Sequence, residues 1–177
     1  MRVLITGGTG LVGSHACRAL QHAGHDVRLL VRNADKAHNY FAQLRETPPE
    51  MVTGDVTDRS SVTAALAGCE GLFAVNVGGV KNVVGEALAA GVSRIVCISS
   101  ITAIFNPDAS KVTPDAPPTP SSMPYGQSKI QAELYLRGLQ EQGAPVAIVY
   151  PGGILGPDDP GFSDSCKAIK HRIDNGF

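Results

Sequence analysis

Short apolar runs that alternate with longer stretches of helical pattern constrain the fold of this chain more than any other feature. The runs are brief and rich in Val, Ile or Leu, and they cover residues 3–6, 27–31, 51–53, 72–75, 95–99 and 146–150. They lack a strict apolar–polar alternation, which is typical of strands buried on both faces of a parallel sheet. Amphipathic helical patterns lie between them at residues 11–23, 60–67, 81–90 and 121–142. Strand then helix, repeated, predicts an α/β fold, a doubly wound parallel sheet with helices on both faces.

Composition and charge narrow the class of protein. The 177 residues carry a formal net charge of −1, so we expect no nucleic-acid partner and no anionic membrane surface. No apolar run approaches the roughly 20 residues of a membrane span, and Gly7 interrupts the N-terminal apolar stretch before a signal peptide could form. The four cysteines show no paired spacing, which predicts free thiols and no metal site. We therefore expect a cytoplasmic protein.

Three spaced glycines, with Gly8 beside the first of them, stand where the first run meets the first helical stretch, in the sequence TGGTGLVG. Gly7 permits a tight turn, Gly10 lets the backbone approach a pyrophosphate, and Gly13 lets the helix pack close to the strand. Phosphates then lie at the positive end of the helix dipole. Because the motif follows a strand and opens a helix, it predicts a dinucleotide site in a Rossmann-type fold. The alternative is a glycine-rich turn without a ligand.

The ends of the second and third runs indicate which dinucleotide binds. NAD sites place an acidic residue about 20 residues after the glycines, but here Arg32 occupies that position and Lys36 follows one turn later. A guanidinium matches a phosphate, so we expect NADP, with NAD as the second choice. In the stretch GDVTD, Asp55 is placed to receive the adenine amino group and Val56 to pack on the ring. The alternatives are a solvated Arg32, and a helix cap formed by Asp55 or Asp58.

Tyr125 and Lys129 are spaced four residues apart on a predicted helix, which puts both side chains on one face. A lysine ammonium ~4–5 Å from a phenol, at an effective dielectric constant of ~20, contributes about 3–4 kcal/mol. That is about two to three units of tyrosine pKa, enough for proton transfer near pH 7. Ser99 ends the fifth run and Ser100 follows it, at a position where a hydroxyl can hold a substrate carbonyl. The alternative for both serines is a turn or helix cap.

Taken in chain order, these motifs resemble the extended short-chain dehydrogenases/reductases, the NAD-dependent epimerase/dehydratase group. The resemblance rests on residues 6–13, Asp55, Ser99, Ser100, Tyr125, Lys129 and residues 151–153, and it covers nearly the whole chain. Within the group, the stretches SSITAIFNPD and VYPGGILGPDDPG are similar to dihydroflavonol-reductase-like members. The resemblance therefore implies the same Rossmann-type fold.

The resemblance also implies a role for each site residue. Tyr125 is the proton donor during reduction, and Lys129 lowers its pKa and binds the nicotinamide ribose. Ser100 orients the substrate carbonyl, with Ser99 or Thr102 as alternatives. The full expected cofactor set is Gly7, Thr9, Gly10, Leu11, Val12, Gly13, Arg32, Lys36, Asp55, Val56, Ser99, Tyr125, Lys129, Pro151, Gly152, Gly153 and Ile154.

The function that these expectations favour is NADP-dependent reduction of a ketone or an aldehyde. A nucleotide-sugar epimerase or dehydratase that uses the same tyrosine, lysine and bound cofactor is one alternative. A dinucleotide sensor without catalysis is another, although such a sensor would be expected to lack the Tyr125 and Lys129 pair. The expected partner is a small carbonyl substrate, and the resemblance also implies a possible homodimer formed through helices.

Two places depart from the family pattern. The connection after the fourth run is very short, so we expect residues to be absent between Phe73 and Gly79, with one consecutive Cα pair far beyond the ~3.8 Å of a trans peptide. The alternative is a helix that begins later, near Val80. Residues 1–160 are expected to form the NAD(P)-binding domain. Residues 161–177 are expected to begin a small substrate-binding part that continues further in the family.

Overall fold

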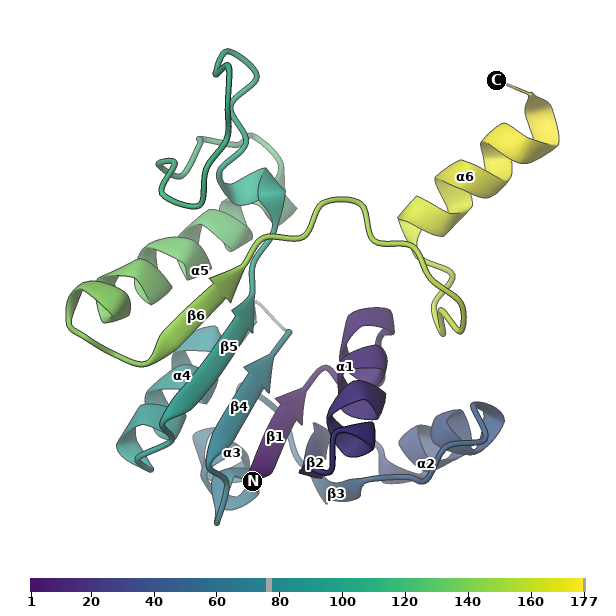
Figure 1. Cartoon of the computed structure of the whole chain (residues 1–177), viewed down its shortest axis with the longest axis vertical. Helices are drawn as coiled ribbons and strands as arrows, with labels where there is room; N and C mark the ends of the chain where they lie inside the picture. The colour runs from purple at the N-terminus through teal and green to yellow at the C-terminus, as the bar shows by residue number, and fades with distance from the viewer. Residues whose placement is uncertain (76–77, 177) are drawn as a thin grey trace.

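The computed structural model describes residues 1–75 and 78–176 and contains one parallel six-stranded sheet with the strand order β3-β2-β1-β4-β5-β6. Helices cover both of its faces, which confirms the predicted doubly wound Rossmann-type fold (Figure 1). The strands are β1 (Arg2–Thr6), β2 (Asp26–Val31), β3 (Glu50–Thr53), β4 (Gly71–Ala74), β5 (Arg94–Ile98) and β6 (Val146–Val149). The helices are α1 (Leu11–His22), α2 (Ala34–Gln43), α3 (Arg59–Leu66), α4 (Val80–Ala89), α5 (Pro124–Glu141) and α6 (Asp164–Asn175), with the 3-10 helix η1 at Ile101–Ala103.

Two apolar layers hold the helices on the sheet. On one face, Val3 and Ile5 of β1 pack with Phe41 of α2 and Cys17 of α1. On the other face, Leu4 belongs to a larger cluster that takes in buried residues of α3, α4 and α5. Successive residues of β1 therefore serve opposite cores, because side chains along a strand alternate between its two faces. This explains why the strand sequences read as continuous apolar runs.

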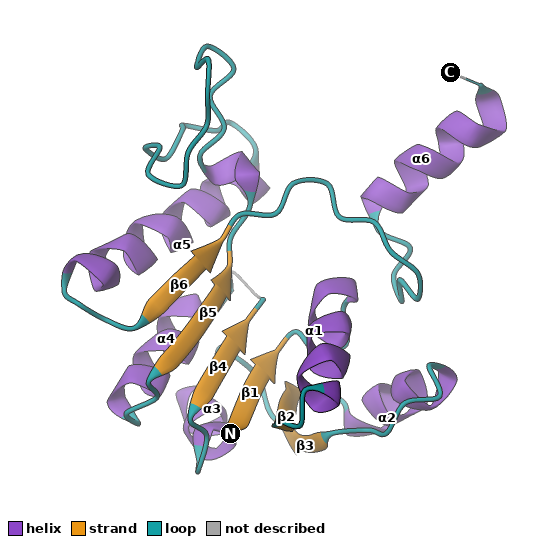
Figure 2. Cartoon of the chain, in the orientation of Figure 1, coloured by secondary structure: helices purple, strands orange, loops and turns teal. Residues whose placement is uncertain are grey.

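The strand order creates a switch point in the sheet. The chain winds outward from β1 through β2 to β3, then returns to β4 on the other side of β1 and winds outward through β5 to β6. The connections after β1 and β4 therefore leave the carboxyl edge of the sheet in opposite directions (Figure 2). In open α/β sheets such a switch point creates a crevice. Ligands of open α/β sheets bind at such a crevice.

The connection between β4 and α4 bears on the expectation of absent residues. Gly79 caps α4 with φ of 84°, a left-handed conformation that favours glycine, and the helix begins at Val80. The start of α4 at Val80 therefore agrees with the alternative drawn from the sequence, a helix that begins near Val80. The predicted break between Phe73 and Gly79 involves residues 76–77, which lie outside the described residues, and it stays a prediction.

Two further segments matter for the site. Residues 106–123 form an irregular connection between η1 and α5, as their Pro-, Ser- and Thr-rich composition predicts. Residues 150–163 leave β6, cross the carboxyl edge and lead to α6, which projects away from the sheet (Figure 1). In the described part of the chain, no helix is long and apolar enough to cross a membrane.

Candidate functional site

The glycine-rich turn between β1 and α1 depends on close backbone contacts. Gly7 adopts φ of 74°, and the N–H of Gly10 donates to the Gly7 carbonyl at 3.1 Å. A Cβ atom on Gly13 would lie 2.1 Å from that same carbonyl oxygen, so only glycine allows α1 to approach β1 this closely. Gly10 caps α1 without a side-chain hydrogen bond, which leaves the first N–H groups of the helix for an anion. The turn therefore fits a pyrophosphate.

A cavity of about 360 Å³ opens beside this turn, at the ends of β1, β2 and β3. Among the predicted cofactor residues, Gly7, Thr9, Arg32, Asp55 and Val56 line it. The structure thus brings together residues from three separate connections. We call this space the adenosine cavity, after the half of the cofactor that the sequence predicts here. Lys36 is exposed on the first turn of α2 and is not among the lining residues.

The two aspartates of the GDVTD stretch have different roles in the fold. Asp58 caps α3, because its carboxylate accepts from the N–H groups of Ser60 and Ser61. Asp55 instead lines the cavity, and its Oδ1 accepts from the Thr57 N–H at 2.8 Å and the Thr57 hydroxyl at 2.7 Å. These hydrogen bonds, and then the charge of Arg32, lower the pKa of Asp55. Asp55 therefore remains ionised, and its second oxygen is available to accept an adenine amino group.

Tyr125 and Lys129 lie together at the start of α5. The Lys129 ammonium is 5.7 Å from the centroid of the Tyr125 ring, and the lysine is only 5% exposed while the tyrosine is 54% exposed. Lys129 Nζ donates to the carbonyls of Ile98 at 3.3 Å and Ser99 at 3.4 Å, where β5 ends. Burial lowers the pKa of Lys129. A buried cation beside an exposed phenol is an arrangement that can assist proton transfer.

The two serines after β5 behave differently. Ser100 caps η1, as one reading of the sequence expects, and its oxygen accepts from the Thr102 hydroxyl at 2.9 Å. Its own proton therefore remains available for a substrate carbonyl. Both serines are buried, and the Ser99 hydroxyl donates to Glu133 at 2.8 Å. Ser100 is thus better placed than Ser99 to hold a carbonyl, while the Ser99 backbone contacts Lys129.

Sequence reasoning missed a buried polar network behind Lys129. Glu133 is fully buried and accepts from Ser99, from Arg137 Nε at 2.6 Å and from the Tyr150 hydroxyl. Burial, followed by the hydrogen bond to Glu133, raises the pKa of Tyr150 to about 12. One signal was present in the sequence: Lys129, Glu133 and Arg137 recur every four residues and therefore share one face of α5.

The segment after β6 is anchored at both ends. The Pro151 carbonyl accepts from the Ile101 N–H at 3.0 Å. At the far end, the Asp158 carbonyl accepts from the Tyr40 hydroxyl at 2.9 Å, and the Asp158 carboxylate pairs with Arg18 at 3.1 Å. The predicted nicotinamide residues Gly152, Gly153 and Ile154 lie between these anchors, in the part that crosses the carboxyl edge (Figure 1).

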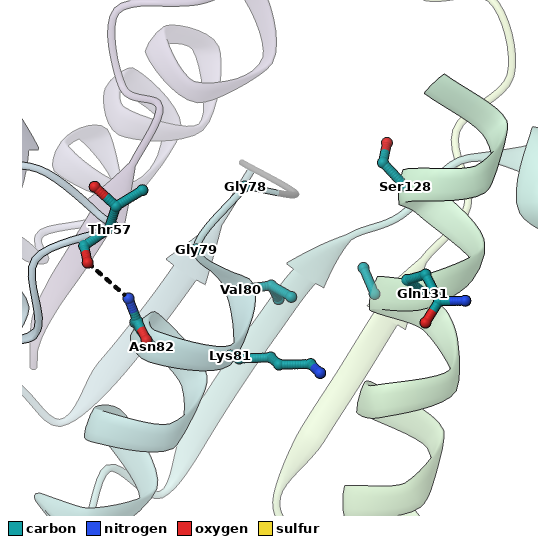
Figure 3. A pocket seen from close by; sticks show the side chains of 9 residues that line it. Thr57, Gly78, Gly79, Val80, Lys81, Asn82, Ser128 and Gln131 are labelled. Atoms are coloured by element: carbon teal, nitrogen blue, oxygen red, sulfur yellow. Dashed lines mark hydrogen bonds between the residues drawn. The ribbon is translucent and has the colours of Figure 1, made fainter. Parts of the chain in front are cut away.

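A second cavity of about 360 Å³ lies between the start of α4 and the flank of α5 (Figure 3). It shares Thr57 and Gly78 with the adenosine cavity, so the two adjoin. Asn82 Nδ2 donates to the carbonyls of Val56 at 3.2 Å and Thr57 at 3.0 Å, which ties α4 to the loop that carries Asp55. These two hydrogen bonds hold the loop that carries Asp55 and Val56 against α4.

Comparisons with known proteins agree with this geometry. A family described as NAD(P)H-binding matches residues 7–165. A protein of Synechocystis sp. that carries the provisional name dihydroflavonol 4-reductase is 32% identical over 175 residues, which is 88% of this chain and 50% of that protein. A UDP-glucose 4-epimerase of Bacillus subtilis is 28% identical over 200 residues, which is 93% of this chain and 58% of the epimerase. The chain spans about half the length of the curated relatives it matches.

A solved structure agrees with the family match. A short-chain dehydrogenase/reductase superfamily protein from Agrobacterium tumefaciens, crystallised with bound NAD, is 26% identical with a TM-score of 0.69. The match covers 85% of this chain and 48% of that protein. With its glycine turn, its Tyr125–Lys129 pair and these relatives, the chain belongs to the NAD(P)H-binding extended short-chain dehydrogenases/reductases.

Proposed function

We propose that the protein is an NADP-dependent reductase of a ketone or an aldehyde. The observation that carries the proposal is the buried Lys129 ammonium 5.7 Å from the ring of the exposed Tyr125, at the carboxyl edge of the sheet. A dinucleotide sensor would have no need to bury a cation beside a phenol, because burial of a charge is unfavourable. The similarity to a protein named as a dihydroflavonol 4-reductase supports the same reading.

The residues of the chain divide the work of such a reduction. The cofactor, when bound, supplies the hydride that the carbonyl carbon accepts. Ser100 donates a hydrogen bond to the carbonyl oxygen and orients it. Tyr125 gives its hydroxyl proton to that oxygen and regains a proton from solvent, which its exposure allows. Lys129 stabilises the tyrosinate that forms, because a neighbouring positive charge favours the ionised phenol.

Arg32 carries the proposed preference for NADP. It lines the adenosine cavity with Asp55, and its guanidinium suits the phosphate that distinguishes NADP from NAD. The relative from Agrobacterium tumefaciens was crystallised with NAD, so family membership alone does not favour NADP. The preference therefore rests on Arg32.

A second candidate is epimerisation of a nucleotide sugar, which the similarity to a UDP-glucose 4-epimerase favours. An epimerase of this mechanism keeps its dinucleotide tightly bound and returns it unchanged, whereas a reductase consumes free reduced cofactor. The two candidates therefore differ in cofactor exchange.

The test is cofactor turnover by the purified protein. NADPH absorbance is followed with a panel of aliphatic and aromatic ketones and aldehydes, and the protein is denatured in parallel to release any dinucleotide. We expect carbonyl-dependent NADPH oxidation and little released dinucleotide. Stoichiometric release of NAD, with interconversion of a UDP-sugar and no carbonyl reduction, would replace the reductase with the epimerase.

A further inference from the structure

Glu133 is a fully buried carboxylate in the middle of α5. Ser99 Oγ donates to its Oε2 at 2.8 Å, while Arg137 Nε, at 2.6 Å, and the Tyr150 hydroxyl donate to its Oε1. A buried charge is tolerated only when donors satisfy it, and these three contacts do so. A satisfied buried ion pair nevertheless adds little net stability compared with apolar packing. The position of the charge therefore calls for another explanation.

The partners of Glu133 belong to segments that border the candidate active site. Ser99 follows β5 and precedes Ser100. Tyr150 follows β6 and precedes the expected nicotinamide segment that begins at Pro151. Arg137 also donates from Nη2 to the Pro114 carbonyl at 2.9 Å, in the loop that leads to α5. One carboxylate thus joins three parts of the wall around the site.

Lys129 depends on the same wall for its position. Its ammonium donates to the carbonyls of Ile98 and Ser99, and in the described part of the chain no carboxylate lies within 4.0 Å of it. The Ser99 residue therefore has two contacts on α5: its carbonyl accepts from Lys129, and its hydroxyl donates to Glu133 one turn further along the helix. A shift of Ser99 would move an acceptor of the Lys129 ammonium.

We infer that Glu133 is a positioning residue, which holds Ser99 and, through the Ser99 carbonyl, sets the Lys129 ammonium for the nicotinamide half of the cofactor. The inference rests on the proposed function, since it assumes that Lys129 contacts the nicotinamide ribose. Glu133 itself touches neither substrate nor cofactor, because it is completely enclosed. Its effect should be confined to the nicotinamide half of the dinucleotide, because the adenosine cavity lies elsewhere, at the ends of β1, β2 and β3.

The test compares binding of the whole cofactor with binding of its adenosine half. NADPH and adenosine 2′,5′-bisphosphate are titrated into the full chain as wild type, Glu133→Gln and Ser99→Ala. Glu86→Gln is the matched control, because Glu86 is also an ion-paired glutamate, and its partners Arg59 and Thr63 belong to α3 and not to the network around Ser99. If the wild type prefers NADH, then NADH and 5′-AMP replace the two probes.

We expect Glu133→Gln and Ser99→Ala to weaken NADPH binding about tenfold, the effect of losing one hydrogen bond near a charged group, and to leave adenosine-half binding within about twofold. Glu86→Gln should change neither affinity. Equal loss for both probes would show a merely structural role and overturn the inference, as would unchanged NADPH binding. If Glu133→Gln does not fold, the titrations of Ser99→Ala alone test the inference, because this variant keeps the hydrogen bonds of the Glu133 carboxylate with Arg137 and Tyr150.

The same titrations separate this inference from the proposed function. Failure of the wild type to bind NADPH and NADH would overturn the proposed function and the inference together. Tight wild-type binding with unchanged affinity in both variants would overturn the inference alone. Wild-type binding with a selective loss of whole-cofactor affinity would support both.

Discussion

Lys129 is a single residue whose burial suits the candidate site but is unfavourable for the stability of the fold. Its side chain is 5% exposed, and the ammonium is held by two backbone carbonyls instead of a carboxylate. Burial without a countercharge penalises the protonated form, which is why the pKa of Lys129 is lowered. The folded protein therefore binds this proton less tightly than the unfolded chain does.

That difference predicts a pH dependence of stability. Between the lowered folded pKa and the ordinary value of 10.5, the unfolded state binds more protons, so unfolding free energy rises with pH. Wild type should therefore gain stability relative to Lys129→Met as the pH rises from 7 to 10. The gain should be about 1.4 kcal/mol for each unit by which folding lowers the pKa of Lys129. Thermal unfolding of both proteins across this range measures it. A flat stability difference would mean that folding leaves the pKa of Lys129 unchanged, and one that falls with pH would mean that the fold stabilises the ammonium; either result contradicts the prediction.

The proposed choice between NADP and NAD also depends on a single side chain, that of Arg32. Replacing it with alanine should lower the preference for NADPH over NADH by at least about tenfold, since a charge-assisted contact to the phosphate is lost. Lys36→Ala should have a smaller effect, because Lys36 does not line the adenosine cavity. Competitive titration of the two cofactors measures both variants. An unchanged preference in Arg32→Ala would assign the phosphate contact to another residue.

At the scale of elements, the site is made by connections rather than by strands or helices themselves. The β1–α1 turn sets the distance between a strand and a helix, and the segment after β6 spans the carboxyl edge between two anchors. Asp158, at one anchor, adopts φ of 59°, which is unfavourable for a residue with a side chain and is maintained by its contacts with Arg18 and Tyr40. Both connections can be tested by small substitutions.

The glycine turn predicts two different outcomes from one type of substitution. Gly13→Ala should destabilise the protein by about 2 kcal/mol or more, because its Cβ would meet the Gly7 carbonyl oxygen at 2.1 Å. Gly10→Ala should fold normally, since the nearest atom would be 3.5 Å away, but should bind dinucleotide poorly because Gly10 is the position expected to let the backbone approach the pyrophosphate. Thermal unfolding and cofactor titration separate the two. Equal stability of both variants would contradict the close-packing role of Gly13.

The anchor at Tyr40 predicts a change in local protection. Tyr40→Phe removes the hydrogen bonds of its hydroxyl with the Asp158 carbonyl and with Ser14 Oγ, and it should increase protease cleavage within residues 151–162 several-fold, with little change in global stability. Tyr135→Phe is the matched control, because its hydroxyl makes only a 3.5 Å contact with the Lys81 carbonyl on α4. Limited proteolysis with mapping of the cut sites makes the comparison. Cleavage rates that match the wild type in Tyr40→Phe would show that the other anchors suffice.

At the scale of the whole molecule, local patterns predicted the sheet and the order of its motifs. Buried strands and glycine turns leave a signal in a few consecutive residues, so β1 and α1 were found to within one or two residues. The network around Glu133 was not found, because Ser99, Arg137 and Tyr150 converge only after β5, α5 and β6 pack together. The anchor between Tyr40 and Asp158 joins residues 118 apart in the chain, and no local pattern encodes such a contact.

Tyr125→Phe is the decisive variant for the proposed reduction, because it removes a proton donor and almost no volume. NADPH binding and carbonyl-dependent NADPH oxidation are measured for wild type and variant, with the substrate identified from the panel. We expect Tyr125→Phe to bind NADPH within about twofold of wild type and to reduce the carbonyl at least about 100-fold more slowly, which is the range for loss of a general acid. Turnover by Tyr125→Phe at the wild-type rate would contradict the assignment of the active site.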